Sequence, residues 1–462
     1  MKLSQINRAY FVGIGGIGMS ALARYFKALG KPVGGYDKTS KPLTKQLEKE
    51  GMIIHYKDEP TLIPSPFTEN RKNTLVVYTP AVPKDHKELN YFIDQGYTVK
   101  KRAEVLGMLS KELRCIGIAG THGKTSISTL TAHLFNKSTL GCNAFLGGIA
   151  KDYNNNLIIN PKSKYLIAEA DEFDRSFLQL SPEIALVTSI DQDHLDIYED
   201  KQTLGQAFSE FIGQIRKNGT FIKHKDVFVP IPENKQIYQY TYSLNGPSDF
   251  YAANINVQEG KYWFDLATPE ETITNIPFAL PGQLNIENAV AALSIAYLFG
   301  IDKTTMINSL KNYSGIERRF DIQVNQEDLL YIDDYAHHPS EINYTIKSIR
   351  EMYPDKKILG IFQPHLYSRT QHLAKEFGES LERLDEAIIL DIYPAREEPI
   401  EGVCSGLIKQ HMQSIPVTLS NKKDVLDLIR EKEFDILLTM GAGDIDQLVE
   451  PIRNNYIENS AE

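Results

Sequence analysis

The hydrophobic residues of this 462-residue chain fall into short apolar runs separated by amphipathic segments of helical length. Near the N-terminus, the apolar runs 8–14, 32–37 and 75–78 alternate with amphipathic segments at 17–29 and 43–50. Short apolar runs that alternate with helical segments are typical of parallel strands covered by helices. The first part of the chain is therefore predicted to form an α/β domain with a parallel sheet.

The same alternation returns twice further along the chain. A second unit is expected from the apolar runs 114–119, 165–171 and 185–190 and the helical segments 288–299 and 303–313, with an added β-rich part at about 220–275. A third is expected from the apolar runs 329–333, 358–362, 387–390 and 434–440. A chain of this length is too long for one core. We predict three α/β domains, with bounds at 1–107, 108–315 and 316–462.

Composition narrows the class of protein. Hydrophobic residues make up 42% of the chain and charged residues 24%, which is ordinary for a globular enzyme. The net charge of −10 argues against nucleic acid as a partner, because phosphate backbones bind basic surfaces. The three cysteines form no C-x-x-C pair, and neither a signal peptide nor an apolar run of membrane-spanning length is present. We expect a cytoplasmic protein that acts on small anions, with no membrane partner.

A glycine-spaced turn follows the apolar run 114–119 and opens the next helical segment. It consists of Gly120, Thr121, His122, Gly123, Lys124 and Thr125. Glycines let main-chain N–H groups approach phosphate oxygens, a lysine adds a mobile positive charge, and a threonine hydroxyl can bind Mg²⁺. The full pattern G-x-x-x-x-G-K-[ST] is not met, because Ile118 stands at its first position. The turn predicts a triphosphate site, and a purely structural helix entry is the alternative.

A second glycine motif lies at the end of the first apolar run. Its members are Gly13, Gly15, Gly16, Gly18, Met19 and Ser20, and Asp37 follows at the end of the next predicted strand. The pattern G-x-G-x-x-G between a strand and a helix is typical of a diphosphate site. The helix N-terminus recognises only the anion, so a nicotinamide dinucleotide, a UDP-sugar and a purely structural turn all remain open.

Two acidic clusters follow predicted strands of the second unit. The first, 169–174, holds four carboxylates that include Glu169, and the second, 191–196, includes His194. Ligands and Mg²⁺-binding acids of α/β proteins gather at the carboxyl ends of strands. Both clusters are therefore candidates for the metal site, with a solvated loop as the alternative for each.

Further polar residues follow the later elements. Asn285 and Asn288 lie three positions apart at the start of a helix, so they share a face and could bind the adenine edge or cap the helix. The segments 331–339, 362–370 and 441–444 each follow a strand of the third unit. The first two combine acids, histidines and an arginine, which favours a site. The third is either an anion-facing turn or a tightly packed one.

Jointly, these motifs resemble the Mur ligases over nearly the whole chain. The resemblance is carried by the strings 13–20, 120–125, 169–172, 193–196, 315–320, 333–339, 362–365 and 441–444. It implies a Rossmann-like first domain, a central P-loop-type ATP-binding domain with a mostly parallel sheet, and a Rossmann-like third domain. UDP-sugar would be held by the first domain, ATP and Mg²⁺ or Mn²⁺ by the second, and the third would close over the amino acid.

The resemblance also implies roles for particular residues. ATP would be bound by the loop Gly120 to Thr125, by Asn285 and Asn288, and by Arg319 and Asp334. The metal would be held by Thr125, Glu169 and His194, and the amino acid by Tyr335, His337 and Arg369. Lys124, His194 and His337 are the expected catalytic residues, and the UDP-sugar would lie on the glycine motif from Gly13 to Ser20 with Asp37.

The implied reaction is the ATP-dependent, ADP-forming ligation of L-alanine to the lactyl carboxylate of UDP-N-acetylmuramate through an acyl phosphate, by a monomer or a dimer. One alternative is a recycling ligase that adds a preformed tripeptide, and another is a nicotinamide-dependent dehydrogenase. Leu284 and Leu366 stand where the family often has His and Arg. The substrate contacts that those two side chains would make are therefore not expected in this chain. Lys201 lies near the second acidic cluster, where related ligases carry a carbamylated lysine.

Overall fold

The computed structural model describes residues 3–171, 173–190, 201–233, 235–258, 261–395 and 397–458. The chain divides into two compact units. One unit comprises Met1–Asn254, Asp265–Ile276 and Glu287–Tyr313, and the other comprises Ile255–Phe264, Pro277–Ile286 and Ser314–Glu462. Three successive parts of the sequence each form a separate sheet, which confirms the predicted α/β class.

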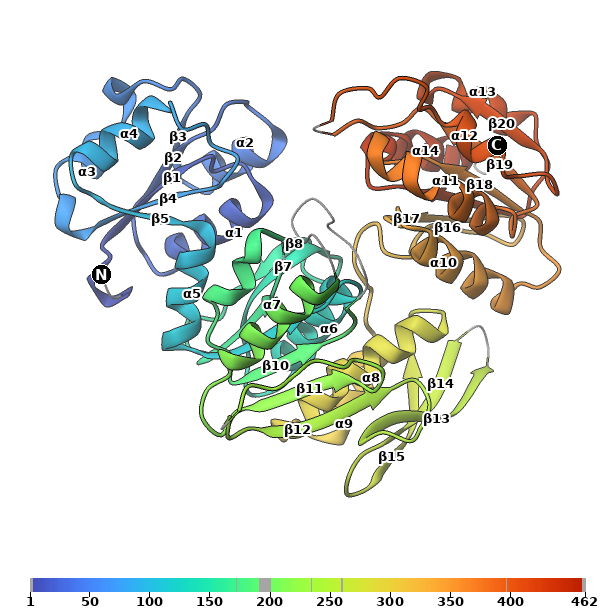
Figure 1. The fold of residues 1–462 in the computed structure, drawn as a ribbon, viewed down its shortest axis with the longest axis horizontal. Coiled ribbons are helices and arrows are strands. Elements are labelled where there is room, and N and C mark those ends of the chain that lie inside the picture. The colour runs from blue at the N-terminus through green and yellow to red at the C-terminus, as the bar shows by residue number, and fades with distance from the viewer. Residues whose placement is uncertain are drawn as a thin grey trace. The chain divides into compact units, whose positions relative to one another are not determined.

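The first sheet has five strands in the order β3-β2-β1-β4-β5, all paired in parallel (Figure 1). Its strands are β1 (Arg8–Val12), β2 (Val33–Tyr36), β3 (Ile53–His55), β4 (Thr74–Tyr78) and β5 (Thr98–Lys101). Its helices are α1 (Ile17–Ala28), α2 (Pro42–Lys49), α3 (Ser65–Thr68), α4 (Lys87–Asp94) and α5 (Arg102–Glu112). This is the strand order of the Rossmann fold.

Helices cover both faces of this sheet, because alternate residues of each strand point to opposite sides. Phe11 packs in a core with Phe26 of α1 and Leu109 of α5. Its neighbour Tyr10 packs on the other side with Phe67 of α3 and Phe92 of α4. The apolar runs of the sequence therefore reflect strands that are buried on both faces.

The second sheet has ten strands in the order β15-β14-β13-β12-β11-β10-β6-β9-β7-β8. Its strands are β6 (Arg114–Ala119), β7 (Asn143–Ala150), β8 (Asn155–Ile158), β9 (Tyr165–Glu169), β10 (Ile184–Val187), β11 (Thr220–His224), β12 (Tyr238–Ser243), β13 (Phe250–Gln258), β14 (Lys261–Ala267) and β15 (Thr272–Phe278). From β7 to β13 the neighbours in this order pair in parallel. Strand β8 pairs antiparallel with β7 at one edge, and the part of the sheet from β7 to β13 is parallel, as predicted.

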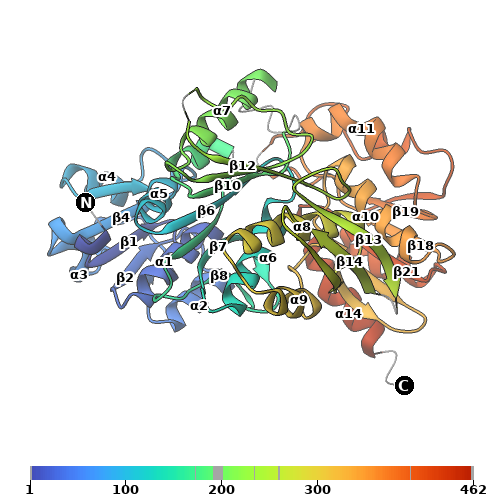
Figure 2. The same cartoon turned by 90° about the horizontal axis from the view of Figure 1, so that it is seen from below.

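The helices of this part are α6 (Lys124–Lys137), α7 (Lys201–Gly213), α8 (Gln283–Leu298) and α9 (Lys303–Lys311). Figure 2 shows α7 on one side of the sheet and α6 and α8 on the other. Phe208 and Phe211 of α7 share a core with Cys115 of β6 and Ala185 of β10. Helix α6 contacts β6, β7 and β9 and carries the phosphate loop at its N-terminus.

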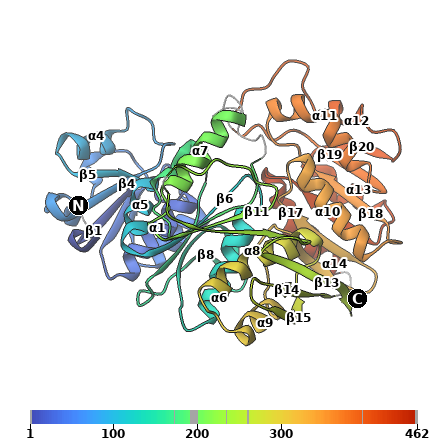
Figure 3. The same cartoon turned by 60° about the horizontal axis from the view of Figure 1, so that its bottom comes forward.

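The third sheet has six strands in the order β16-β17-β21-β18-β19-β20, of which β17, β18, β19 and β20 are labelled in Figure 3. Its strands are β16 (Asp321–Asn325), β17 (Leu330–Asp334), β18 (Ile358–Phe362), β19 (Glu386–Leu390), β20 (Val417–Ser420) and β21 (Ile436–Met440). Its helices are α10 (Pro339–Met352), α11 (Tyr367–Leu381), α12 (Gly406–Lys409), α13 (Val425–Arg430) and α14 (Val449–Glu458). Only β16, at one edge, pairs antiparallel.

Two cores lie on the two faces of this sheet. Ile358 and Phe362 of β18 pack with Ile346 of α10 and other residues of one face. Leu359 and Ile361 of the same strand belong to the core that contains α13 and α14. Strand β21 pairs in parallel with β17 and with β18, so the carboxyl ends of these three strands lie side by side. The segments 335–338, 363–366 and 441–444 leave the sheet at that edge.

Several short strands were not predicted, and some predicted strands end early. Residues 8–14 were predicted as one strand, but β1 ends at Val12 because Gly13 turns the chain at φ +86°. The run 185–190 forms β10 only to Val187, and Thr188 and Ser189 leave the strand to contact the phosphate loop. Within the described residues, no helix is both long and apolar enough to cross a bilayer.

Candidate active site

The loop from Gly120 to Thr125 links β6 to α6 and takes a shape that needs its glycines. Gly120 has φ +126°, and a Cβ there would lie 2.0 Å from Thr188 Oγ1. Gly123 is the N-cap of α6 at φ +79°, and a Cβ there would lie 2.9 Å from Asn288 Oδ1. Both positions are thus restricted to glycine by backbone conformation and by space. The start of a helix is a favourable place for an anion, because its first main-chain N–H groups point along the axis toward it.

Lys124 is the first residue of α6, and its Nζ donates a hydrogen bond to Gly120 O at 2.7 Å. This contact folds the lysine back over the loop, so its positive charge lies beside the main-chain N–H groups of the helix start. A cation and helix N-terminal donors at one place suit a phosphate group. The predicted ATP loop therefore has the required shape, while the contact itself stays a prediction.

Thr125 and Glu169 meet beside this loop. Thr125 Oγ1 donates to the Glu169 carboxylate at 3.0 and 3.2 Å, and Glu169 ends β9, the strand next to β6. Gly147 of β7 leaves room for that carboxylate, since a Cβ there would lie 2.3 Å from Glu169 Oε2. A hydroxyl and a carboxylate are hard oxygen donors, which is the ligand chemistry of Mg²⁺. These two predicted metal ligands therefore fit the ion.

Residues that sequence reasoning did not assign to the site hold the loop in place. Thr121 Oγ1 lies 2.8 Å from Ser189 Oγ, and Ser189 Oγ also accepts from His122 N at 3.2 Å. Thr188 Oγ1 donates to His122 O at 2.5 Å. Thr188 and Ser189 both follow β10, which pairs with β6. The signal that could have found them is therefore their place at the carboxyl end of an apolar strand beside the phosphate loop.

The second acidic cluster, which includes His194, lies outside the described residues, as does the side chain of Lys201. Their predicted roles stay predictions. Within the part of the chain that is described, no three His, Cys, Asp or Glu side chains gather as a metal-binding group.

Asn285 and Asn288 lie in the first two turns of α8 but have different surroundings. Asn285 Nδ2 donates to Pro281 O at 2.6 Å, which is a local contact at the start of the helix. Asn288 is 8% exposed and its side-chain oxygen lies close to Gly123. The predicted adenine-binding pair therefore includes one amide beside the phosphate loop and one that also stabilises the helix start.

The first glycine motif forms the turn between β1 and α1. Gly15 N donates to Asp37 Oδ2 at 2.7 Å, so Asp37 at the end of β2 holds this turn. Gly16 is the N-cap of α1. A Cβ at Gly18 would lie 2.7 Å from Arg102 Nη1, which places a guanidinium that sequence reasoning did not select beside the helix start. These positions are compatible with a diphosphate at this turn.

Met19 and Ser20 complete the predicted UDP-sugar group, but their side chains are buried. Met19 is 2% exposed and belongs to the core under α1, and Ser20 Oγ donates to Ile17 O at 2.8 Å. Any ligand contact from these two residues would have to come from their main chain.

Asp333 and Asp334 end β17 and have different partners. Asp334 Oδ2 accepts from Phe320 N at 2.9 Å and Oδ1 accepts from Ala336 N at 2.8 Å, so this carboxylate fixes two loop segments. Burial raises the pKa of Asp334 to about 6. The contact of Asp334 with ATP stays a prediction. The structure shows that the Asp334 carboxylate also holds the main chain at Phe320 and Ala336.

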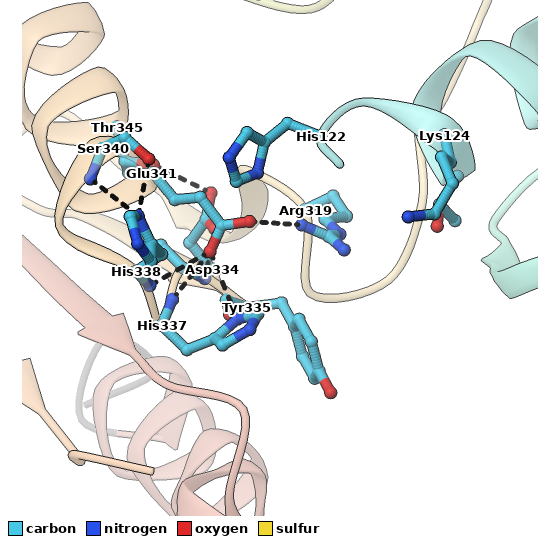
Figure 4. Close-up of polar contacts among 12 residues, drawn as sticks. His122, Lys124, Arg319, Asp334, Tyr335, His337, His338, Ser340, Glu341 and Thr345 are labelled. Atoms are coloured by element: carbon cyan, nitrogen blue, oxygen red, sulfur yellow. Dashed lines mark hydrogen bonds and ion pairs between the residues drawn. The ribbon is translucent and has the colours of Figure 1, made fainter. Parts of the chain in front are cut away.

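His337 and Tyr335 leave the same strand end (Figure 4). The two rings pack edge to face with centroids 5.2 Å apart. His337 Nδ1 lies 3.0 Å from Tyr335 O and 3.2 Å from Glu341 Oε2, and both of those atoms are acceptors. Nδ1 must therefore carry the proton of the neutral ring, which leaves Nε2 as the acceptor. Burial lowers the pKa of His337 and favours this neutral form.

Glu341 organises these residues and was not selected from the sequence. Its Oε2 accepts from the main-chain N–H groups of His337 at 3.0 Å and His338 at 3.2 Å, and its Oε1 lies 3.9 Å from Arg319 Nη1. It stands three residues after His338, the N-cap of α10, so the capping pattern of a glutamate at this spacing was an available signal.

Two further segments meet at this edge of the sheet. The His365 ring lies against His337, with centroids 6.1 Å apart, and stacks on Tyr393 at 5.8 Å. Arg369 is close enough to lower the pKa of His337 through its charge. The fold therefore brings the predicted amino-acid residues Tyr335 and His337 into contact, and Arg369 acts on His337 through its charge.

The turn from Gly441 to Asp444 is packed against Gln363. Gln363 Nε2 donates to Asp444 Oδ1 at 2.8 Å, and Ile445 N donates to Gln363 Oε1 at 2.9 Å. A Cβ at Gly443 would lie 2.4 Å from Gln363 Oε1. Of the two interpretations of this motif, these contacts favour tight packing.

Three family models match successive parts of the chain: the Mur ligase family catalytic domain at residues 8–114, the Mur ligase middle domain at 118–296 and the Mur ligase glutamate ligase domain at 318–443. Together with the three sheets, they define the class. The chain belongs to the Mur ligase family, and it is a ligase.

Within this family, the chain is similar to proteins of one named activity. It is 47% identical to UDP-N-acetylmuramate–L-alanine ligase of Parabacteroides distasonis over 98% of each chain. A crystal structure of UDP-N-acetylmuramate–alanine ligase from Thermotoga maritima has a TM-score of 0.79, with 23% identity, and covers 98% of this chain and 99% of its own. A murein peptide ligase from Psychrobacter arcticus has a TM-score of 0.66, with 22% identity and coverage of 97% and 99%.

Proposed function

We propose that this chain is the ligase that joins L-alanine to the lactyl carboxylate of UDP-N-acetylmuramate, with ATP cleaved to ADP and phosphate, in the cytoplasmic synthesis of peptidoglycan precursors. The observation that carries the proposal is the 47% identity over 98% of the chain to a ligase of that name. The geometry around Thr125 and Glu169 supports the use of ATP with Mg²⁺.

A carboxylate is a poor acyl donor, so the reaction needs an activation step. The lactyl carboxylate oxygen attacks the γ-phosphorus of ATP, the bond to the β-phosphate oxygen breaks, and ADP leaves from an acyl phosphate. Lys124 and the main-chain N–H groups of the loop would stabilise the negative charge that builds up on the transferred phosphoryl group. Mg²⁺, when bound at Thr125 and Glu169, would offset the repulsion between the two anions.

The amine of L-alanine then attacks the acyl carbon, its surplus proton departs, and phosphate leaves. His337 is the candidate base, because its neutral ring has Nε2 available as an acceptor while Nδ1 is held by Tyr335 O and Glu341. Arg369 is the candidate partner for the carboxylate of alanine, since a guanidinium binds a carboxylate with two parallel hydrogen bonds.

One assay tests the proposal against its main alternative. The purified protein is incubated with UDP-N-acetylmuramate, ATP, Mg²⁺ and either L-alanine or the tripeptide, and ADP and product mass are measured. We expect ADP and an alanyl product with L-alanine alone. Product only with the tripeptide would support the recycling ligase instead. Family membership does not favour the nicotinamide-dependent dehydrogenase, and hydride transfer has no part in the assay.

A further inference from the structure

Two adjacent arginines, Arg318 and Arg319, precede β16 and make different contacts. Both guanidiniums lie over the Tyr335 ring, Arg318 at 5.3 Å and Arg319 at 5.0 Å from its centroid, but Arg319 also lies 3.9 Å from Glu341. Arg318 points to the sheet, where its Nε donates to Asp333 Oδ2 at 3.1 Å and its Nη2 donates to Gly441 O at 2.6 Å. Both arginines therefore border the candidate ligand residue Tyr335, and Arg318 in addition joins two strand ends.

The main chain of Arg318 is held as firmly as its side chain. Its N–H donates to Asp321 Oδ2 at 3.0 Å and its carbonyl accepts from Tyr335 N at 2.6 Å. The residue has φ +61°, a left-handed conformation that is costly for a side chain other than glycine. Phe320, two residues on, has φ +46°, and its N–H is held by Asp334. Such strain persists only where surrounding contacts compensate for it.

The acceptor at the centre of this network is fully buried. Asp333 is 0% exposed, and its second oxygen accepts from Thr439 Oγ1 at 2.7 Å, while the Arg318 side chain is 21% exposed. An aspartate buried in this way needs a cation partner, because an unpaired buried charge is costly. The guanidinium of Arg318 contacts Asp333 and Gly441 O together, and its donors form a rigid fork that suits such a bridge better than the single ammonium of a lysine.

We propose that Arg318 is a positioning residue of the nucleotide site. It clamps the turn 316–320 between the ends of β17 and β21, and this fixes the direction of Arg319 and the place of Tyr335. The inference rests on the proposed function, in which Arg319 contacts ATP. Arg318 itself contacts no ligand in this scheme, so its removal acts on ATP through its neighbour.

The first test compares Arg318→Lys with the matched control Arg319→Lys in the full-length protein. ATP binding in the presence of Mg²⁺ is measured by titration calorimetry, and UDP-N-acetylmuramate binding serves as the internal reference. Lysine keeps the charge near Asp333 but cannot bridge it to Gly441 O. We expect both variants to weaken ATP binding by about ten- to a hundredfold and to leave the UDP-sugar affinity unchanged. Wild-type ATP affinity in Arg318→Lys would overturn the inference.

The second test separates positioning from stability. The double variant Arg318→Met with Asp333→Asn removes both charges, so it should recover most of the melting temperature that Arg318→Met alone loses. A positioning role predicts that ATP binding stays weak in the double variant. Recovery of ATP binding together with the melting temperature would overturn it. Failure of the proposed function is distinct, because it would appear in the wild-type protein as an absence of ATP binding.

Discussion

Thr125 Oγ1 lies 3.0 Å from Glu169 Oε2, although 44 residues separate the two in sequence. The hydroxyl belongs to the first turn of α6 and the carboxylate to the end of β9, so the contact joins the phosphate loop to the neighbouring strand. A site for a divalent cation beside a phosphate loop needs such a pair.

Replacing Glu169 by Gln should raise the Mg²⁺ concentration for half-maximal activity by about tenfold or more, because the amide lacks the charge that attracts the ion. The measurement is initial rate against Mg²⁺ concentration. Asp171→Asn, two residues further on, is the matched control and should leave that concentration unchanged. If the two variants exchanged their effects, the ligand would be Asp171.

Replacing Lys124 by Ala should reduce kcat by roughly a hundred- to a thousandfold or more, since it removes a donor aimed at the transferred phosphoryl group. UDP-N-acetylmuramate affinity, measured by calorimetry, should remain close to that of the wild type. The control is Lys137→Ala at the exposed far end of α6. A near-normal rate in Lys124→Ala would contradict the assigned role.

Gly120→Ala should destabilise the fold by about 3 kcal/mol, as both the conformation and a close contact oppose a side chain there. Its Cβ would lie 2.0 Å from Thr188 Oγ1 and 2.9 Å from two main-chain nitrogens. Gly30→Ala is the control, because Gly30 also has a positive φ, +74°, but no atom lies within 4 Å of the added Cβ. Chemical denaturation should show a loss of about 1 kcal/mol for that control. Equal losses would refute the steric part of the argument.

Glu88 is expected to make the stability of the first domain depend on pH. Its carboxyl is 0% exposed and accepts from Tyr10 OH at 2.6 Å, and burial raises the pKa of Glu88 to about 7. The folded state therefore binds this proton more tightly than the unfolded chain does. Ionisation of the Glu88 carboxyl therefore lowers the free energy of unfolding. This loss grows as the pH rises from about 4.5, the ordinary pKa of a glutamate, to about 7, and it is complete above that pH.

Glu88→Gln should consequently stabilise the protein at pH 8 by roughly 2–3 kcal/mol and have little effect near pH 4.5. Denaturant unfolding at a series of pH values measures this difference. The exposed Glu69→Gln variant is the control and should not alter the profile. A Glu88→Gln variant that is less stable than the wild type at pH 8 would show that the ionised form is favoured by the fold.

The strands found from the sequence are those buried on both faces. β18, predicted at 358–362, has those bounds, because every residue in it is buried and the apolar run is continuous. Strands at the sheet edges gave weaker signals: β3 has three residues, one of them exposed, and β20 has no buried residue. Strand β7 contains Gly147 and Gly148, which weaken a strand pattern, and their use appears only when Glu169 is placed beside them.

The sequence by itself determined the α/β class, the phosphate loop and the resemblance to the Mur ligases, because these depend on residues that are close together in the chain. The tertiary structure decided which side chains meet. Ser189 and Thr188 hold the phosphate loop through contacts that span 66 to 68 residues. Arg318 reaches Asp333 across 15 residues and Gly441 across 123. Local periodicity reports which face of an element is buried, but the partner across that face follows only from strand order and register.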